Sequence, residues 1–339
     1  MLSYSIPLIA TLCLSSVATA TAMAFNATEN HWTLFQNFVN KFEKNYINLI
    51  EFENRFEIFK ENMQYIHSEN ERQKSYQLGV TPFADLTREE FARFNGIRLG
   101  GPFSSPCSKF KSTEQKNLRS LSDVPSSYDW RDHNAVTPVK DQGQCGSCWS
   151  FSATGAMEGA WAISTGDLVS LSEQQLVDCS KSYGNHGCNG GLMDDAFEYA
   201  MDNGMCTEES YPYTAKGGDC QKCDTVVEIS SCVDVTKNNQ VDLKTAVSEG
   251  PVSIAIEADT KAFQLYTSGV LTGDACGTNL DHGVLIVGYG EESGTEYWLV
   301  KNSWGPAWGD DGYIKIGRSD STNDPGVCGI AMQPSYPVV

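Results

Sequence analysis

Three residue types that together can cleave peptide bonds occur in separate short motifs of this chain. Cys148 ends the run Gln-Gly-Gln-Cys-Gly-Ser-Cys, His282 lies in Leu-Asp-His-Gly, and Asn302 lies in Lys-Asn-Ser-Trp-Gly. A thiolate is a good nucleophile, a neighbouring imidazole can take its proton, and an amide can orient the imidazole ring. We therefore predict that these three residues form the catalytic centre of a peptide-cleaving enzyme.

The spacing of these residues is typical of one enzyme family. His282 and Asn302 follow Cys148 by 134 and 154 residues, and Cys145-Gly-Ser-Cys-Trp149 is the pentapeptide that surrounds the nucleophile of papain-type enzymes. The chain resembles the papain-family cysteine proteases, and in particular the cathepsin L group. The resemblance implies an α+β, papain-like fold with a helical left domain and a β-barrel-like right domain, preceded by a helical N-terminal prodomain.

The N-terminus predicts export. An apolar run over residues 6–18 leads into Ala-x-Ala sites, as in a secretory signal peptide, and a glycosylation sequon follows at Asn26. We expect a signal peptide at 1–24, an inhibitory propeptide at 25–123 and a mature peptidase domain at 124–339. The apolar run is too short to span a bilayer, so we expect no membrane segment. Within the secretory pathway, a lysosomal or vacuolar location and an extracellular one both stay open.

Charge restricts the partners of the chain. Residues 1–123 contain 13 acidic and 13 basic side chains, so the whole net charge of −19 lies on residues 124–339. Such a surface argues against nucleic acid or anionic lipid as a partner, and no residue pattern indicates a metal or another cofactor. The resemblance implies a monomer that binds protein and peptide substrates, its own propeptide and cystatin-type inhibitors.

The propeptide carries two motifs. One is a stripe of six residues that fall within an arc of about 100° on a helix, in the order of the prosegment motif of cathepsin-L-like proteases: Glu51, Arg55, Phe59, Asn62, Ile66 and Asn70. The other, Gly79-Val-Thr-Pro-Phe-Ala-Asp85, resembles the second prosegment motif of that group, with Thr81 in place of an Asn. An earlier helix is predicted over His31 to Tyr46, and an exposed, cleavable linker over 95–123.

We expect the propeptide to occupy the active-site cleft of a zymogen. Because it is neutral overall and the enzyme is acidic, apolar stripes and local charge pairs must hold the two together. Protonation of carboxylates such as Asp85 at low pH would then loosen the propeptide and permit self-cleavage.

The mature part changes its hydrophobic period midway. Helices are predicted from Cys148 to Thr165, ended by Gly166, and from Leu192 to Asn203, ended by Gly204. Short branched or aromatic runs that predict strands follow over 252–256, 284–289, 297–301 and 313–316. A helical half thus precedes a β half, and the resemblance places the catalytic cleft between them.

Cys148 needs a cation to ionise. An ordinary thiol, with a pKa of about 8.5, is only about 0.03% thiolate at pH 5. In papain-type enzymes the thiol pKa is about 3 to 4, a shift of about 7 kcal/mol, whereas a helix N-terminus contributes at most about 2 kcal/mol. Of the five histidines, His282 is the best candidate for the imidazolium partner.

Other roles are implied by the resemblance alone. Asn302 would accept the second imidazole N–H, and Trp304 would shield that bond from water. Gln142 would donate its side-chain amide to the tetrahedral oxyanion together with the backbone N–H of Cys148.

Substrate selection is likewise implied by the resemblance. Gly190 and Gly191 would bond the substrate backbone, where a side chain would obstruct approach. The S2 pocket would be lined by Leu192, Met193, Ala255, Leu280 and Gly283, with Gln333 at its floor. Because a neutral amide cannot pair with a guanidinium as a carboxylate would, we expect apolar or aromatic P2 residues to be preferred over Arg.

Twelve cysteines in an exported chain favour disulfides. The resemblance pairs Cys145 with Cys188, Cys179 with Cys220, and Cys276 with Cys328. One further bridge and one free thiol are the simplest outcome for the remaining Cys206, Cys223 and Cys232, a count that Cys107 of the propeptide could change. A zinc site built from Cys206, Cys220, Cys223 and Cys232 is an alternative that would take Cys220 from its expected partner.

Three other functions fit part of the sequence. Cys145 and Cys148 could be a redox pair on a thioredoxin-like fold, which would have no use for His282 or Asn302. An inhibitory or storage homologue would be expected to lack the nucleophile. A peptide ligase would use the same acyl-enzyme and differ only in the access of water.

Overall fold

The computed structural model describes residues 31–72, 75–98, 105–109 and 124–339. The expected signal peptide and the Asn26 sequon lie outside these residues. Within the described part of the chain, none of the helices is long and apolar enough to cross a membrane.

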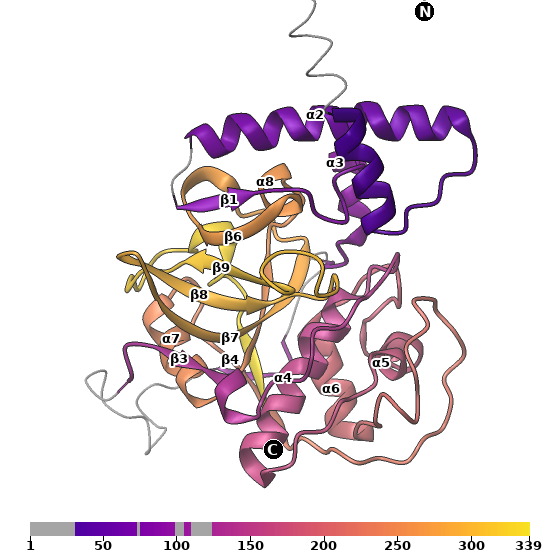
Figure 1. Ribbon diagram of the computed structural model, residues 1–339. Helices are drawn as coiled ribbons and strands as arrows, with labels where there is room; N and C mark the ends of the chain where they lie inside the picture. Colours follow the sequence, from indigo (N-terminus) through magenta and orange to yellow (C-terminus); the bar gives the residue numbers. More distant parts are fainter. Residues whose placement is uncertain (1–30, 73–74, 99–104, 110–123) are drawn as a thin grey trace, which may run out of the picture.

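The N-terminal part of the chain forms a helical unit that lies across one end of the molecule (Figure 1). Residues 31–41 are helical, which confirms the predicted helix except for its last turn. The other elements of the unit are α2 (Leu49–Arg72), β1 (Tyr76–Leu78), α3 (Arg88–Phe91) and the 3-10 turn η1 (Ala92–Phe94).

The predicted stripe on α2 holds this unit together. Phe59 is fully buried, and the amide of Asn62 donates to the carbonyls of Ala84 (2.9 Å) and Leu86 (3.1 Å). Two further contacts involve other residues of the stripe. Arg55 pairs with Glu90, and Asn70 exchanges two hydrogen bonds with the backbone of Leu78. The stripe therefore fixes the chain that follows α2.

A helical half follows, and its two predicted helices are confirmed. The elements are η3 (Trp130–His133), α4 (Cys148–Thr165), α5 (Glu173–Cys179), η4 (Ser180–Tyr183) and α6 (Met193–Asn203). Helix α4 ends at Gly166, which takes a left-handed φ of 82° and closes the last turn. Helix α6 ends before Gly204, as expected.

The β half is built on one sheet in the order β1-β6-β9-β8-β7-β5-β10-β4-β2, with β3 paired to β7. Its strands are β2 (Ser108–Lys109), β3 (Tyr128–Asp129), β4 (Ser231–Asp234), β5 (Val252–Ile256), β6 (Tyr266–Leu271), β7 (His282–Glu292), β8 (Thr295–Lys301), β9 (Tyr313–Gly317) and β10 (Ser335–Val338). Short helices and turns complete it: α7 (Gln240–Glu249), α8 (Lys261–Gln264), η5 (Gly273–Ala275) and η6 (Val327–Gly329). The four strands predicted from sequence are all present as β5, β7, β8 and β9.

Both ends of the sheet order come from the expected propeptide. Strand β1 pairs antiparallel with β6 at one end, and β2 pairs parallel with β4 at the other. An unpaired sheet edge offers a row of backbone donors and acceptors. The propeptide therefore docks by strand addition as well as by its helices.

The prediction of an exposed linker over 95–123 is wrong for two of its segments. Residues 95–98 lie against the residues predicted to be catalytic, and Cys107, in 105–109, is 7% exposed and bridged to Cys232. The low apolar content of these segments hid contacts that are made mostly by backbone.

Five disulfides occur in the described residues. Three join Cys145 to Cys188, Cys179 to Cys220 and Cys276 to Cys328. The others join Cys206 to Cys223 and Cys107 to Cys232. The expected free thiol among the three extra cysteines is therefore absent from the full-length chain, and the zinc alternative is wrong because Cys206, Cys220, Cys223 and Cys232 are all bridged.

A buried ionic network fastens α4 to its surroundings. The ammonium of Lys140 contacts Glu158 of α4 (3.1 Å) and Glu173 of α5 (2.7 Å). Thr137 donates to Glu158 and accepts from Lys301 at the end of β8. Because an unpaired buried charge is costly, each charge holds its partner's element in place. The network thus fixes α4 relative to the strand that precedes Asn302.

Candidate active site

Cys148 and His282 are brought together by the contact between α4 and β7. Each is the first residue of its element, and each is fully buried. The backbone N–H of Gly283 lies 3.3 Å from the sulfur of Cys148 and donates to it. The two residues that sequence places 134 apart are therefore neighbours.

The close approach of α4 to β7 depends on small residues. Ser152 of α4 donates to the carbonyl of Val284 at 2.6 Å. A Cβ at Gly155 would lie 2.7 Å from a methyl group of Leu285, closer than side chains pack. The missing side chain at Gly155 thus sets the distance between helix and strand.

Asn302 and Trp304 lie around the imidazole of His282. Nε2 of His282 is 2.8 Å from the side-chain oxygen of Asn302. The Trp304 ring stacks on the imidazole with centroids 4.5 Å apart. The other ring nitrogen, Nδ1, is buried without a hydrogen-bond partner among the described residues. This nitrogen is the one available for a proton from Cys148.

The full-length chain holds these two groups in neutral form. Burial raises the pKa of Cys148 to about 12, despite backbone N–H groups of Gly283 and Gly96 that favour the thiolate. Burial also lowers the pKa of His282 to about 4, against the bond to Asn302. Between these values the thiol keeps its proton and the imidazole is uncharged. The thiolate–imidazolium pair stays a prediction for the cleft once the propeptide has left it.

Gln142 lies at the same site, fully buried. Its side-chain oxygen accepts from Ser303 (2.6 Å), which fixes the orientation of the amide. Its nitrogen donates to the carbonyls of Cys145 (2.8 Å) and Phe94 (2.7 Å). A propeptide carbonyl thus occupies the donor that sequence assigned to the oxyanion.

The propeptide backbone crosses the catalytic residues as an extended segment. Gly191 donates to the carbonyl of Gly96 (2.9 Å), and Arg98 donates to that of Gly191 (3.4 Å), in a parallel bridge centred on Ile97. A Cβ at Gly96 would lie 2.0 Å from the carbonyl oxygen of Gly146. Only glycine permits this approach, so position 96 is fitted to the cleft.

A second contact anchors the propeptide beside the catalytic imidazole. Phe83 and Phe91 pack edge-on against Trp304, at centroid distances of 5.6 and 5.0 Å. Gln264 of α8 donates to the carbonyl of Phe83 (2.8 Å), and the hydroxyl of Thr81 donates to the carbonyl of Gln264 (2.9 Å). Thr81 thus bonds the enzyme directly at the position where the family motif has Asn.

The residues predicted to line S2 divide into two groups. A cavity of about 280 Å³ is lined by Leu192, Met193 and Gln333. Ala255 and Leu280 do not line it but belong to the apolar cluster that contains Met193. Gly283 has no side chain, and two side-chain atoms lie close to it. A methyl group of Ile97 and the sulfur of Met193 are each 3.3 Å from the place where a Cβ of residue 283 would lie.

Sequence reasoning missed several residues at this site. The same cavity is also lined by Asp194, Asp234, Val235, Lys237, Met332, Pro334 and Ser335. Gln264 and Asp281 were missed as well, although Ile97 donates to the backbone carbonyl of Asp281. Four of these residues adjoin a predicted site residue in the chain, a signal that could have found them: Asp194, Asp281, Met332 and Pro334. The others join the site only through the fold.

Comparisons with known proteins agree with this arrangement. Residues 124–338 match the family described as papain family cysteine protease, and residues 35–91 match the cathepsin propeptide inhibitor domain. Germination-specific cysteine protease 1 of Arabidopsis thaliana is 50% identical over 293 residues, covering 84% of this chain and 77% of that protein. The probable cysteine protease RD21B of the same plant is 52% identical over 289 residues, and this chain spans only 60% of its length.

A solved structure gives the same result. A recombinant stem bromelain precursor superposes with a TM-score of 0.82 at 39% identity, covering 91% of this chain and 99% of that one. The likeness includes the N-terminal unit, since the matched protein is a precursor.

The pKa values predict poor reactivity of Cys148 in the full-length chain. With a pKa of about 12, the thiolate fraction at pH 7 is about one in 10⁵. We expect iodoacetamide to label Cys148 at least about 100-fold more slowly at pH 7 than after the propeptide is removed. The measurement is peptide mass mapping over time, with the unfolded chain as a control for complete labelling. Equal rates before and after removal would contradict it.

Proposed function

Because the chain belongs to the papain family of cysteine proteases and carries a propeptide inhibitor domain, we propose that it is a cysteine endopeptidase made as a zymogen, which cleaves through an acyl-enzyme on Cys148. The observation that carries the proposal is the placement of Cys148, the one free thiol of the described residues, against β7, whose His282 is bonded to Asn302.

In the proposed reaction the propeptide has left the cleft. Solvent access then removes the burial that kept both groups neutral, and proton transfer from Cys148 to His282 gives a thiolate beside an imidazolium. The sulfur attacks the substrate carbonyl, and the oxyanion receives hydrogen bonds from Gln142 and the backbone N–H of Cys148. The imidazolium gives its proton to the leaving amine, and water hydrolyses the thioester with His282 as base.

Two groups keep His282 in place during this cycle. Asn302 holds Nε2, so that Nδ1 faces the sulfur, and the stacked ring of Trp304 limits water around that bond.

Each oxyanion donor is worth about 3 to 4 kcal/mol in similar sites. Gln142 is suited to this role because Ser303 already fixes its amide.

We also propose the substrate-binding residues. Gly190 and Gly191 bond the substrate backbone, and Leu192, Met193 and Gln333 line S2, with Ala255, Leu280 and Gly283 behind them. The position of Ile97 beside Met193 and Gly283 supports an apolar P2 residue.

For the cellular setting we propose the secretory pathway, with a vacuolar or extracellular destination. Five disulfides support an oxidising compartment. A monomer that cystatin-type inhibitors can block is part of the same proposal.

The redox alternative is wrong. Cys145 is bridged to Cys188 and Cys148 is free, so the two sulfurs of the Cys-x-x-Cys run do not form a pair. Cys145 therefore has a structural role beside the nucleophile.

Hydrolysis of a Phe-Arg or Leu-Arg peptide amide at pH 5 tests the function. We expect activity from the processed chain and its loss, by at least about 10³-fold, in Cys148→Ala, because no other residue supplies the nucleophile. Product mass distinguishes hydrolysis from ligation to an added amine. Undiminished hydrolysis by Cys148→Ala would contradict the assignment.

The S2 assignment predicts selectivity. A Phe at P2 should exceed an Arg at P2 by at least about tenfold in kcat/KM, because position 333 holds no carboxylate to pair with the guanidinium. The two carboxylates that line the cavity, Asp194 and Asp234, already have partners within the chain. Gln333→Glu should raise the Arg-to-Phe ratio, while Gln333→Met serves as the neutral control. Equal kcat/KM for the two substrates in the unaltered enzyme would show the pocket assignment to be wrong.

Acid activation is proposed to act through the propeptide's own fold. Asp85 is 2% exposed, and its carboxylate accepts from Lys44 (3.0 Å) and Tyr46 (2.9 Å), while Arg55 bonds its carbonyl. Loss of this negative charge would leave Lys44 without its partner.

A second carboxylate acts in the same direction. Burial is the largest single influence on Glu90 and opposes its ionisation. The hydrogen bonds from Arg55 and from the backbone N–H of Thr87, together with the charges of Arg55 and Arg93, outweigh burial, and the pKa of Glu90 is lowered. Its contribution to stability is present above its ordinary value near 4.5 and is lost as pH falls through the lowered pKa.

We therefore expect propeptide cleavage to be faster at pH 4.5 than at pH 7, and faster still at pH 3.5. Asp85→Asn should raise the rate at pH 7 by about tenfold or more, whereas Asp167→Asn, at an exposed position on the enzyme, should not. Gel electrophoresis over time measures the rates. Equal processing at pH 4.5 and pH 7 would sink this mechanism.

A further inference from the structure

One bridge in this chain joins the propeptide to the enzyme. Cys107 and Cys232 are 125 residues apart and bonded to each other, whereas the other four disulfides lie within residues 124–339. Any backbone cleavage between Cys107 and Val124 therefore separates two chains that one covalent bond still connects.

The segment around Cys107 is built into the enzyme rather than lying on its surface. Ser108 and Lys109 pair in parallel with Val233 and Asp234 as strand β2. The hydroxyl of Ser108 donates to the carbonyl of Cys232 (3.2 Å). Both sulfurs are buried, at 7% and 2% exposure of their residues. The bridge thus sits at a formed sheet edge.

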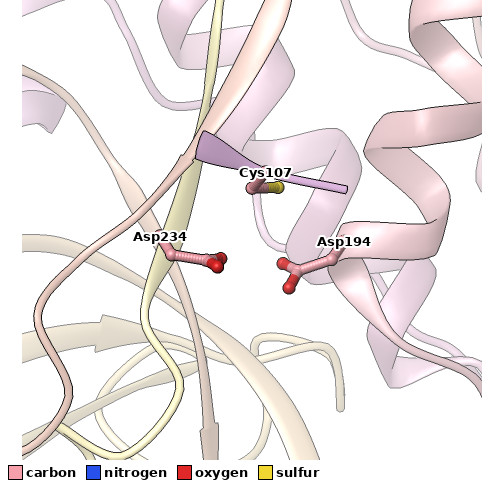
Figure 2. Close-up of side chains that lie close together, drawn as sticks. All are labelled: Cys107, Asp194 and Asp234. Carbon is pink, nitrogen blue, oxygen red and sulfur yellow. The ribbon is translucent and has the colours of Figure 1, made fainter. Parts of the chain in front are cut away.

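Polar contacts hold the same segment beside the proposed S2 pocket. Figure 2 shows Cys107 close to Asp194 and Asp234, which both line that cavity. The hydroxyl of Ser105 lies 3.1 Å from the carboxylate of Asp194 and 3.0 Å from that of Asp234. The same hydroxyl accepts a hydrogen bond from the backbone N–H of Cys107. Because the sulfur of Cys107 is committed to the bridge, these three residues do not form a metal site.

We propose that the Cys107–Cys232 disulfide keeps the cleaved propeptide attached to the enzyme, so that release needs a thiol reductant after the backbone cut. The inference rests on the proposed activation by propeptide removal and adds a second, redox-controlled step to it. Acid and proteolysis loosen and cut the chain, but neither breaks the S–S bond.

The release step is a thiol–disulfide exchange. A thiolate of a small dithiol attacks one sulfur of the bridge, so that a mixed disulfide forms and the other protein sulfur leaves as a thiolate. The second thiol of the dithiol then attacks the mixed disulfide and displaces the first protein sulfur. The bridge gains two electrons and two protons, and the dithiol becomes a disulfide. The products are a propeptide with a Cys107 thiol and an enzyme with a Cys232 thiol.

The attachment also keeps the inhibitor near its site. A segment linked by a short flexible chain has an effective concentration of the order of millimolar, so it rebinds after each dissociation. Its contacts on Gln142 and Gly191 are therefore restored as long as the bridge is closed. Inhibition by an attached propeptide is independent of dilution, whereas inhibition by a released one is not.

The first experiment uses the full-length chain, activated at pH 4.5 under anaerobic conditions so that Cys148 stays reduced. Intact mass and non-reducing gels should show a species that contains residues 31–98 bound to the enzyme, and a dithiol should separate the two. Loss of that fragment without a reductant, or retention of only a short peptide around Cys107, would overturn the proposal.

A matched pair of variants isolates the bridge. In Cys107→Ser with Cys232→Ser, the fragment should leave without a reductant, and activity per molecule should rise on dilution. In Cys206→Ser with Cys223→Ser, which removes a bridge inside the enzyme, the fragment should stay attached. Retention in the first variant, or equal dilution behaviour of that variant and the unaltered chain, would overturn the proposal.

A separate arm keeps this result independent of self-cleavage. The Cys148→Ala chain is cut briefly with a protease specific for Lys and Arg, and mass analysis selects the products cut only at Lys111, Lys116 or Arg119, which keep residues 31–109 in one piece. The cut propeptide should remain bound until a dithiol is added. If acid incubation cleaves nothing, the proposed activation fails, while this arm still decides whether the bridge retains the propeptide.

Discussion

The packing of α4 on β7 is the constraint on which the rest of the structure depends. It places the sulfur of Cys148 within reach of the Gly283 N–H, and a side chain at Gly155 would have to displace a methyl group of Leu285. The buried ionic network of Lys140, Glu158 and Glu173 also fastens α4 to its surroundings. Catalytic geometry in this chain is thus a consequence of how a helix and a strand fit, before any property of the catalytic groups is considered.

The propeptide exploits the same geometry. Its backbone bonds the side-chain amide of Gln142 and the backbone of Gly191, the groups that we propose for binding the substrate. It also covers Cys148 and His282, and in this covered site burial raises the pKa of the thiol and lowers that of the imidazole. Inhibition therefore combines occupation of the cleft with suppression of the nucleophile, and both end when the segment leaves.

Sequence predicted those parts of the molecule that depend on local patterns. Helix α4 could be placed because apolar residues run from Cys148 to a glycine stop. Cys148, His282 and Asn302 could be singled out because their motifs are specific, and the fold brings them together. The path of residues 95–98 could not be predicted, since it is fixed by backbone bonds that any side chains would allow, apart from Gly96. The bridge between Cys107 and Cys232 could not be predicted either, because the spacing of cysteines in a sequence does not determine which of them pair.

The two ends of the propeptide are held by different chemistry. At the β1 end, the unit depends on ionic groups such as Asp85 with Lys44, and Arg88 contacts Asp259 of the enzyme at 3.1 Å. The Arg55–Glu90 pair belongs to the same end, and its contribution to stability is lost as pH falls through the lowered pKa of Glu90. At the β2 end, the pairing of β2 with β4 and the Cys107–Cys232 disulfide hold the propeptide, and neither contact depends on an ionisable side chain. An acidic compartment can therefore loosen the inhibitory helices while leaving the propeptide bound at its other end.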